Sequence, residues 1–172
     1  MTHTLSAWDT RLAALWAALD DLEPAEFVSR IDALAAELPA GSAIALFERG
    51  AAQDSTGHPE HAVPLYHAAL SAGLRGLRRR RAVIQMASSL RNLGDPAEAA
   101  RLLRAELAIP PEQLDADERA LEGAVHGFLA LALVDLGRER EAVALSLTAL
   151  ARTLPRYNRS LARYAEAVAE TV

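Results

Sequence analysis

Histidine side chains offer the most versatile chemistry in this chain, because imidazole can act as a general base or bind a metal ion. The stretch HPEHAVPLYH places His58, His61 and His67 close together. His58 and His61 can approach each other on one helical turn, but His67 falls elsewhere and no third ligand joins them at metal-site spacing. His126 occupies an apolar packing position. The sequence therefore predicts no metal site, capping or surface roles for His58 and His61, and a core role for His126.

The composition excludes several catalytic chemistries. The chain has no cysteine, and all 18 of its basic residues are arginine, so thiolate nucleophiles, disulfides and Schiff-base lysines are ruled out. No serine lies in a nucleophile-elbow pattern, and no acid pair or His–Asp pair stands out. We expect a protein that is not an enzyme and uses no cofactor.

Arginines are concentrated in the stretch LRGLRRRRAV, at the beginning of an expected helix, where the helix dipole favours negative charge. Because successive arginines point all round a helix, we expect a solvated cluster or one paired within the protein. The alternative is a site for an acidic partner or a phosphate. The whole chain has a net charge of −5 and an isoelectric point near 5.5, which argues against a nucleic-acid partner.

Four polar residues recur at the spacing that places side chains on one side of a helix. They are Arg81, Gln85, Ser88 and Asn92. Each can form hydrogen bonds, so the stripe suits a peptide backbone, whereas a solvated helix face without a ligand is the alternative. Neighbouring segments are expected to supply flanking contacts from Phe47, Asp54, Leu131 and Asp135.

Helices must position all of these residues. Apolar residues recur at i, i+3, i+4 and i+7 in almost every long segment, and no stretch alternates like a strand. Helices are expected at 4–20, 24–37, 42–56, 59–72, 77–93, 96–107, 116–136, 139–153 and 156–170, about nine in total.

Charges interrupt the first helix where a signal peptide would be apolar, and no apolar run is long enough to span a membrane. A cytoplasmic setting is expected.

Three corners between helices repeat one pattern. Gly57, Gly94 and Gly137 each follow a helix, where glycine can adopt the left-handed backbone that ends it. Five residues later comes an alanine small enough for a close helix crossing, and four residues after that a side chain that fills the gap; these pairs are Ala62/Tyr66, Ala99/Leu103 and Ala142/Ser146. One turn further on, Ala69 and Ala149 correspond to Glu106 in the middle unit. Each corner therefore predicts an antiparallel helical hairpin.

These corners, with a small residue midway along the preceding helix (Gly50, Ala87 and Ala130), resemble tetratricopeptide repeats. The resemblance implies an all-α, right-handed superhelical stack of antiparallel hairpins, an α-solenoid. On this basis 1–172 is one domain with a degenerate hairpin at 1–40, repeat units at 42–73, 77–107 and 116–153, and a capping helix at 155–172. The corners lie 37 and 43 residues apart, longer than the usual period of about 34.

The resemblance also implies a function. Members of the family usually hold a peptide or a partner helix in the concave groove lined by the first helices of their repeats, so we expect a non-enzymatic scaffold for protein interactions. One alternative is a regulatory module associated with a transcription or nucleic-acid complex. Another is a purely structural homodimer built through the Trp8/Trp16 helix or the terminal helix. No membrane partner is expected.

Overall fold

The computed structural model describes residues 6–170, and within this range it contains ten α-helices, two short 3₁₀ helices and no strand. The all-α fold predicted from apolar spacing is confirmed. The described helices form two compact units, an N-terminal unit (6–74) and a C-terminal unit (75–170). The single domain over 1–172 stays a prediction. Gly73 and Gly76 flank this boundary with φ of +84° and +58°, so neither helix next to the boundary continues across it.

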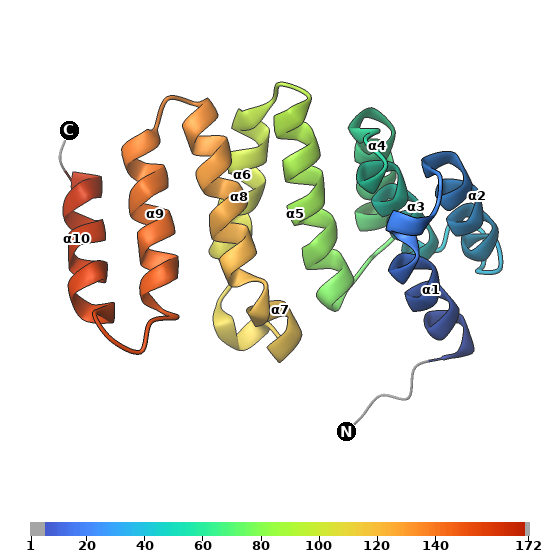
Figure 1. Cartoon of the computed structure of the whole chain (residues 1–172), viewed down its shortest axis with the longest axis horizontal. Helices are drawn as coiled ribbons and strands as arrows, with labels where there is room; N and C mark the ends of the chain where they lie inside the picture. Colours follow the sequence, from blue (N-terminus) through green and yellow to red (C-terminus); the bar gives the residue numbers. More distant parts are fainter. Residues whose placement is uncertain (1–5, 171–172) are drawn as a thin grey trace. The chain divides into compact units, whose positions relative to one another are not determined.

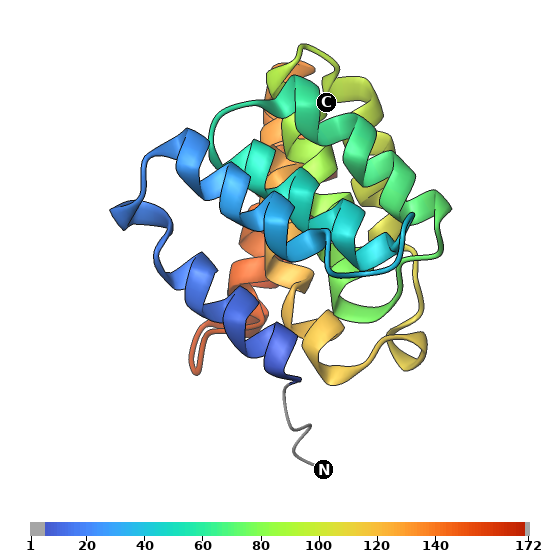
Figure 2. The ribbon, with the colours of Figure 1, turned by 90° about the vertical axis from the view of Figure 1, so that its right-hand side faces the viewer.

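The N-terminal unit contains α1 (Ala7–Ala17), η1 (Leu19–Asp21), α2 (Pro24–Ala35), α3 (Ala43–Ser55) and α4 (Pro59–Ser71). Successive α-helices pack against each other, and Figure 2 shows α2, α3 and α4 as neighbours coloured from blue to green. A proline inside a helix is expected to bend or shorten it, but α4 continues to Ser71 although Pro64 lies inside it, so the helix is not shortened. Pro64 is exposed, which keeps its ring on the outside of the helix.

Both tryptophans of α1 are used inside the N-terminal unit. The Nε1 atom of Trp8 donates a hydrogen bond to the carbonyl of Leu34 at 2.9 Å, and that of Trp16 donates to the Glu48 carboxylate at 3.0 Å. The Trp16 ring also meets Phe27 edge-on at 5.0 Å. Trp8 and Trp16 lie eight residues apart and are therefore expected to share a face that packs against the second helix, and these contacts with α2 confirm it.

The C-terminal unit contains α5 (Gly76–Asn92), α6 (Pro96–Leu107), η2 (Pro111–Gln113), α7 (Ala116–Ala120), α8 (Glu122–Asp135), α9 (Glu139–Ala151) and α10 (Asn158–Glu170). α6 packs against both α5 and α8, and α5, α8, α9 and α10 follow one another as neighbours (Figure 1). The core between α6 and α8 includes Leu103, Val125 and Leu133.

The glycine corners have the predicted geometry. Gly57, Gly94 and Gly137 have φ of +86°, +91° and +70°. At Gly94 the amide of the next residue, Asp95, donates to the Leu90 carbonyl at 2.9 Å, and the glycine amide donates to Arg91 at 3.0 Å. This pair of bonds satisfies the last carbonyls of a helix. The Asp95 side chain then accepts from the Glu98 amide at 3.0 Å and caps α6, the role expected of an aspartate directly before a helix that begins with proline.

The small residues lie at the helix crossings. Ala62 and Ala99 are completely buried, and Ala142 is nearly so. A Cβ atom added to Gly50 would lie 3.1 Å from the Tyr66 ring and 3.2 Å from the Cβ of Leu65, so α3 and α4 cross too closely for a larger residue there. In the third hairpin, Ser146 is exposed and its hydroxyl donates to the Ala142 carbonyl, so its predicted packing role is wrong.

Two further predictions about the C-terminal unit differ from the structure. The helix expected at 116–136 is two helices, because the Leu121 amide bonds to Glu118, three residues back, and closes α7 before α8 begins. The sequence predicts Tyr157, Leu161 and Tyr164 on the inner side of the terminal helix. Tyr157, which precedes α10, and Tyr164 are exposed, and Leu161 is half-buried. Ala165 is buried. The buried side of α10 is therefore the one that contains Ala165, and not the one that contains Tyr164.

Candidate binding surface

The predicted polar stripe lies on a single helix, α5. Arg81, Gln85 and Ser88 are half-buried and Asn92, at the last turn, is exposed. The Oε1 atom of Gln85 is shielded from solvent and accepts no hydrogen bond from any described residue. A shielded acceptor without a donor is costly for a protein, which makes Gln85 the most unusual member of the stripe.

The neighbouring helix α8 adds an apolar surface. Leu131 and Val134 lie nearly one turn apart on α8 and are 45% and 47% exposed. At its end, Asp135 accepts from Arg91 of α5, with Nε 2.5 Å from Oδ2 and Nη2 3.3 Å from Oδ1. The Asp135 carboxylate therefore ties α8 to α5 and is already engaged within the unit.

The other two predicted flanking residues belong to the N-terminal unit. Phe47 is completely buried and its ring centroid lies 6.2 Å from that of Tyr66. It is part of the α3–α4 core, so its assignment as a contact for a partner is wrong. Asp54 is half-buried and accepts a hydrogen bond from the Tyr66 hydroxyl at 3.3 Å.

The arginine run at the start of α5 has two members directed into the C-terminal unit. Arg79 donates to both carboxylate oxygens of Glu106 on α6, at 2.6 and 2.7 Å. Arg80 is almost completely buried, and its Nε lies 3.8 Å from Glu106 Oε2. The hydrogen bond that Arg79 donates to Glu106 raises the pKa of Arg79 against the opposing effect of burial. For these two residues, pairing within the protein is confirmed.

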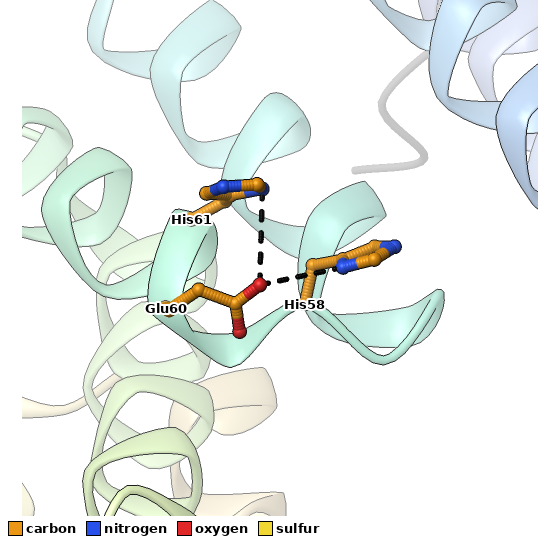
Figure 3. Close-up of side chains that lie close together, drawn as sticks. All are labelled: His58, Glu60 and His61. Atoms are coloured by element: carbon orange, nitrogen blue, oxygen red, sulfur yellow. Dashed lines mark hydrogen bonds and ion pairs between the residues drawn. The ribbon is translucent and has the colours of Figure 1, made fainter.

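The histidine-rich corner brings three polar side chains together at the start of α4 (Figure 3). The Oε1 atom of Glu60 lies 3.4 Å from His58 Nδ1 and 4.0 Å from His61 Nδ1. All three side chains are exposed. The pKa of Glu60 is lowered, first by a hydrogen bond from its own backbone and then by the neighbouring histidines. His58 is exposed and its side chain makes no capping bond to α4, so of the predicted capping or surface role the surface role is confirmed.

Sequence reasoning missed Glu60 as a member of this corner, although the pattern HPEH places its carboxylate between the two histidines. The other histidine predictions fare differently. His67 is exposed farther along α4. His126 is buried with Nδ1 2.8 Å from the Glu122 carbonyl, so its predicted core position is confirmed.

The arrangement of hairpins agrees with a comparison to known families. The sequence profile of the family described as "Tetratrico peptide repeat" matches residues 43–168, which run from the start of α3 into α10. The chain belongs to the tetratricopeptide repeat family. Tetratricopeptide repeat proteins are in general protein–protein interaction modules and generally non-catalytic scaffolds. No curated protein and no solved structure matches the chain.

The tetratricopeptide repeat hairpins place the candidate residues on corresponding helices. The first helix of one hairpin is α5 and that of the next is α8, and they are in contact. Of the eight predicted residues, six lie on these two helices. Sequence reasoning missed Val134 and the Arg91–Asp135 pair beside them. None of the helices in the part that the structure describes is long and apolar enough to cross a membrane.

Proposed function

We propose that the outward side of α5, together with Leu131 and Val134 of α8, binds an extended segment of a partner protein. The family is the general support, since tetratricopeptide repeats are protein interaction modules. The specific support is the adjacency of a polar stripe on α5 and exposed apolar side chains on α8.

Gln85 carries this proposal. Its shielded Oε1 atom lacks a donor among the described residues, so rotation of the side chain toward the surface, where a backbone N–H of a bound peptide can serve as donor, would relieve an unfavourable state. Leaving a buried acceptor unpaired costs about 1–3 kcal/mol, so a donor supplied by the partner would recover part of that free energy. Ser88 and Asn92 extend the polar stripe along α5, which suits successive amides of an extended chain.

The apolar contribution comes from α8. Leu131 and Val134 expose nearly half of their surface, and covering such side chains stabilises a complex by about 25 cal/mol per Å² of buried apolar area. A partner segment with alternating apolar side chains could place its backbone along α5 and these side chains on α8. The partner is therefore expected to be a protein segment of mixed character, and the cytoplasm remains the predicted setting from the sequence.

A displayed library of random peptides provides a direct test. Peptides selected on the full chain should bind Gln85→Ala and Arg81→Glu about tenfold or more weakly than the parent, in line with losing a central contact. Arg101→Glu is the matched control, because Arg101 is an exposed arginine on α6 that pairs with Glu98. Its affinity should equal that of the parent.

Melting temperatures of all three variants must accompany the affinities, because Arg81 also has interactions within the protein. If selected peptides bind Gln85→Ala and Arg81→Glu as tightly as the parent while the variants remain folded, this surface is not the binding site. If the library yields no peptide that binds the parent, the proposal is also wrong.

A further inference from the structure

The corner between α3 and α4 gathers ligand atoms that resemble those of a metal centre. His58, Glu60 and His61 each offer one atom, and these three atoms lie within 4.8 Å of one another. Two imidazoles and one carboxylate form a donor set that suits zinc. We propose that His58, Glu60 and His61 bind a zinc ion at the surface of the N-terminal unit (Figure 3).

The distances are close to those that a zinc ion requires. Bonds of 2.0–2.1 Å in a tetrahedral site place neighbouring ligand atoms about 3.3 Å apart. His58 Nδ1 already lies 3.4 Å from Glu60 Oε1, and His61 Nδ1 lies 4.0 Å from it. The exposed His61 side chain must therefore turn so that its ligand atom comes closer to Glu60 Oε1 than the present 4.0 Å.

The local backbone holds the three residues in place. The amide of His58 donates to the Gln53 carbonyl at 2.9 Å, which anchors His58 to the end of α3. The His61 amide donates back to the His58 carbonyl at 3.0 Å, in the first turn of α4. Pro59 occupies the first helical position with a preset φ. Only side-chain rotations are therefore needed to close the site.

The two imidazole rings lie beside each other at this corner, with centroids 5.7 Å apart and an angle of 25° between their planes. Because the Nδ1 lone pair lies in the ring plane, the rings must rotate before both can point at one ion. The Nδ1 atoms of both histidines approach the same Glu60 oxygen. Three protein ligands at an exposed corner leave a coordination position for water, as in zinc sites with an open position.

This site is independent of the proposed peptide surface, since all of its ligands lie in the N-terminal unit and α5 and α8 lie in the other. Zinc binding can be measured with untagged full-length protein and a chromophoric zinc indicator that competes for the ion. The parent should withdraw one zinc ion per chain from the indicator. Cobalt should show a visible absorption band typical of nitrogen and oxygen ligands in low coordination.

His61→Ala and Glu60→Gln should weaken zinc binding about tenfold or more, because each removes a ligand or its charge. His67→Ala is the matched control, being an exposed histidine on the same helix, and should bind zinc like the parent. Melting curves without zinc verify that the variants are folded. The site does not exist if the parent leaves the indicator saturated, or if His61→Ala and Glu60→Gln compete as well as the parent.

Discussion

Two forked arginine–glutamate pairs, one in each unit, have nearly the same geometry in very different surroundings. Arg11 and Glu37, 26 residues apart, are joined at 2.8 and 2.5 Å. Arg79 and Glu106, 27 residues apart, are joined at 2.6 and 2.7 Å. The side chains of the first pair are 54% and 47% exposed, and those of the second are 27% and 5% exposed.

Burial, more than hydrogen-bond geometry, therefore decides how much such a pair contributes to the stability of the fold. An exposed pair is screened by water and salt and stabilises little. A buried pair gains a stronger attraction but also loses hydration, so its net contribution is modest while the loss of one partner is severe. The Arg79–Glu106 pair is therefore better described as a requirement of the C-terminal unit than as a source of extra stability.

The position of Glu106 explains why the requirement arises in one hairpin. Ala69 occupies the corresponding position in the α3–α4 hairpin and is completely buried. The N-terminal unit therefore has the methyl group of Ala69 at this position, and the C-terminal unit has the carboxylate of Glu106. That carboxylate is balanced by Arg79 and by the buried Arg80, which accounts for two arginines near the start of a helix, where cations are unfavourable.

Glu106→Ala tests the comparison most strongly. It introduces the residue found at the corresponding position of α4, but leaves Arg79 and Arg80 without their buried carboxylate. The unfolding free energy of the C-terminal unit should fall by about 3–5 kcal/mol, the range for breaking a buried ion pair. Urea denaturation of the full chain, followed by helical circular dichroism, measures this loss.

Glu37→Ala is the matched control, since it removes the carboxylate of the exposed pair and should change the urea midpoint very little. Equal effects of Glu37→Ala and Glu106→Ala would show that burial does not distinguish the two pairs. A neutral Glu106→Ala would show that an alanine serves as well in the C-terminal hairpin as Ala69 does in the N-terminal one.

Gly50→Val tests how closely the helices of the N-terminal hairpin pack, in comparison with the hairpins of the C-terminal unit. Its hairpin depends on close contact between α3 and the Tyr66 ring, because a Cβ at Gly50 would lie only 3.1 Å from that ring. Overpacking should lower the unfolding free energy by about 1–3 kcal/mol, measured from the thermal transition. Gly127→Ala on α8 is the control, because its added Cβ meets nothing within 4 Å.

Gly127→Ala should stabilise the C-terminal unit by about 0.5–1 kcal/mol, since a helical glycine costs more backbone entropy than alanine. A Gly50→Val protein as stable as the parent would mean that the α3–α4 crossing is not sterically limited. It would also mean that the N-terminal hairpin does not rely on small residues more than the C-terminal one does.

Local features of the fold were predictable from the sequence because they depend on neighbouring residues. The corner at Gly94, the Asp95 cap and the buried Ala99 all follow from a few consecutive residues. The alternation of helices and corners likewise gave the all-α fold, since apolar spacing at 3.6 residues directly reflects one buried helix face.

Features that depend on the neighbouring helix were not predictable in the same way. Phe47 has the spacing of a groove residue, but Tyr66 on the next helix covers it. The sequence predicts that the arginines of this run are solvated or paired within the protein, but it does not predict that Arg79 pairs with Glu106, 27 residues away. Spacing along one helix gives the face a residue shares with its neighbours, and only packing decides whether that face is covered.

The smallest expected effect concerns Glu37 in acid. The hydrogen bond from Arg11 lowers the pKa of Glu37 below its ordinary value of 4.5. Because the folded-state pKa is the lower one, the contribution to stability is present above about pH 4.5 and is lost as the pH falls through the folded value.

At low ionic strength, the parent should therefore lose slightly more stability than Glu37→Gln between about pH 5 and about pH 3. In about 1 M NaCl the two proteins should follow the same curve, because salt screens an exposed pair. A difference that persisted in high salt would mean that Glu37 behaves like the buried Glu106, and the contrast between the two pairs would fail.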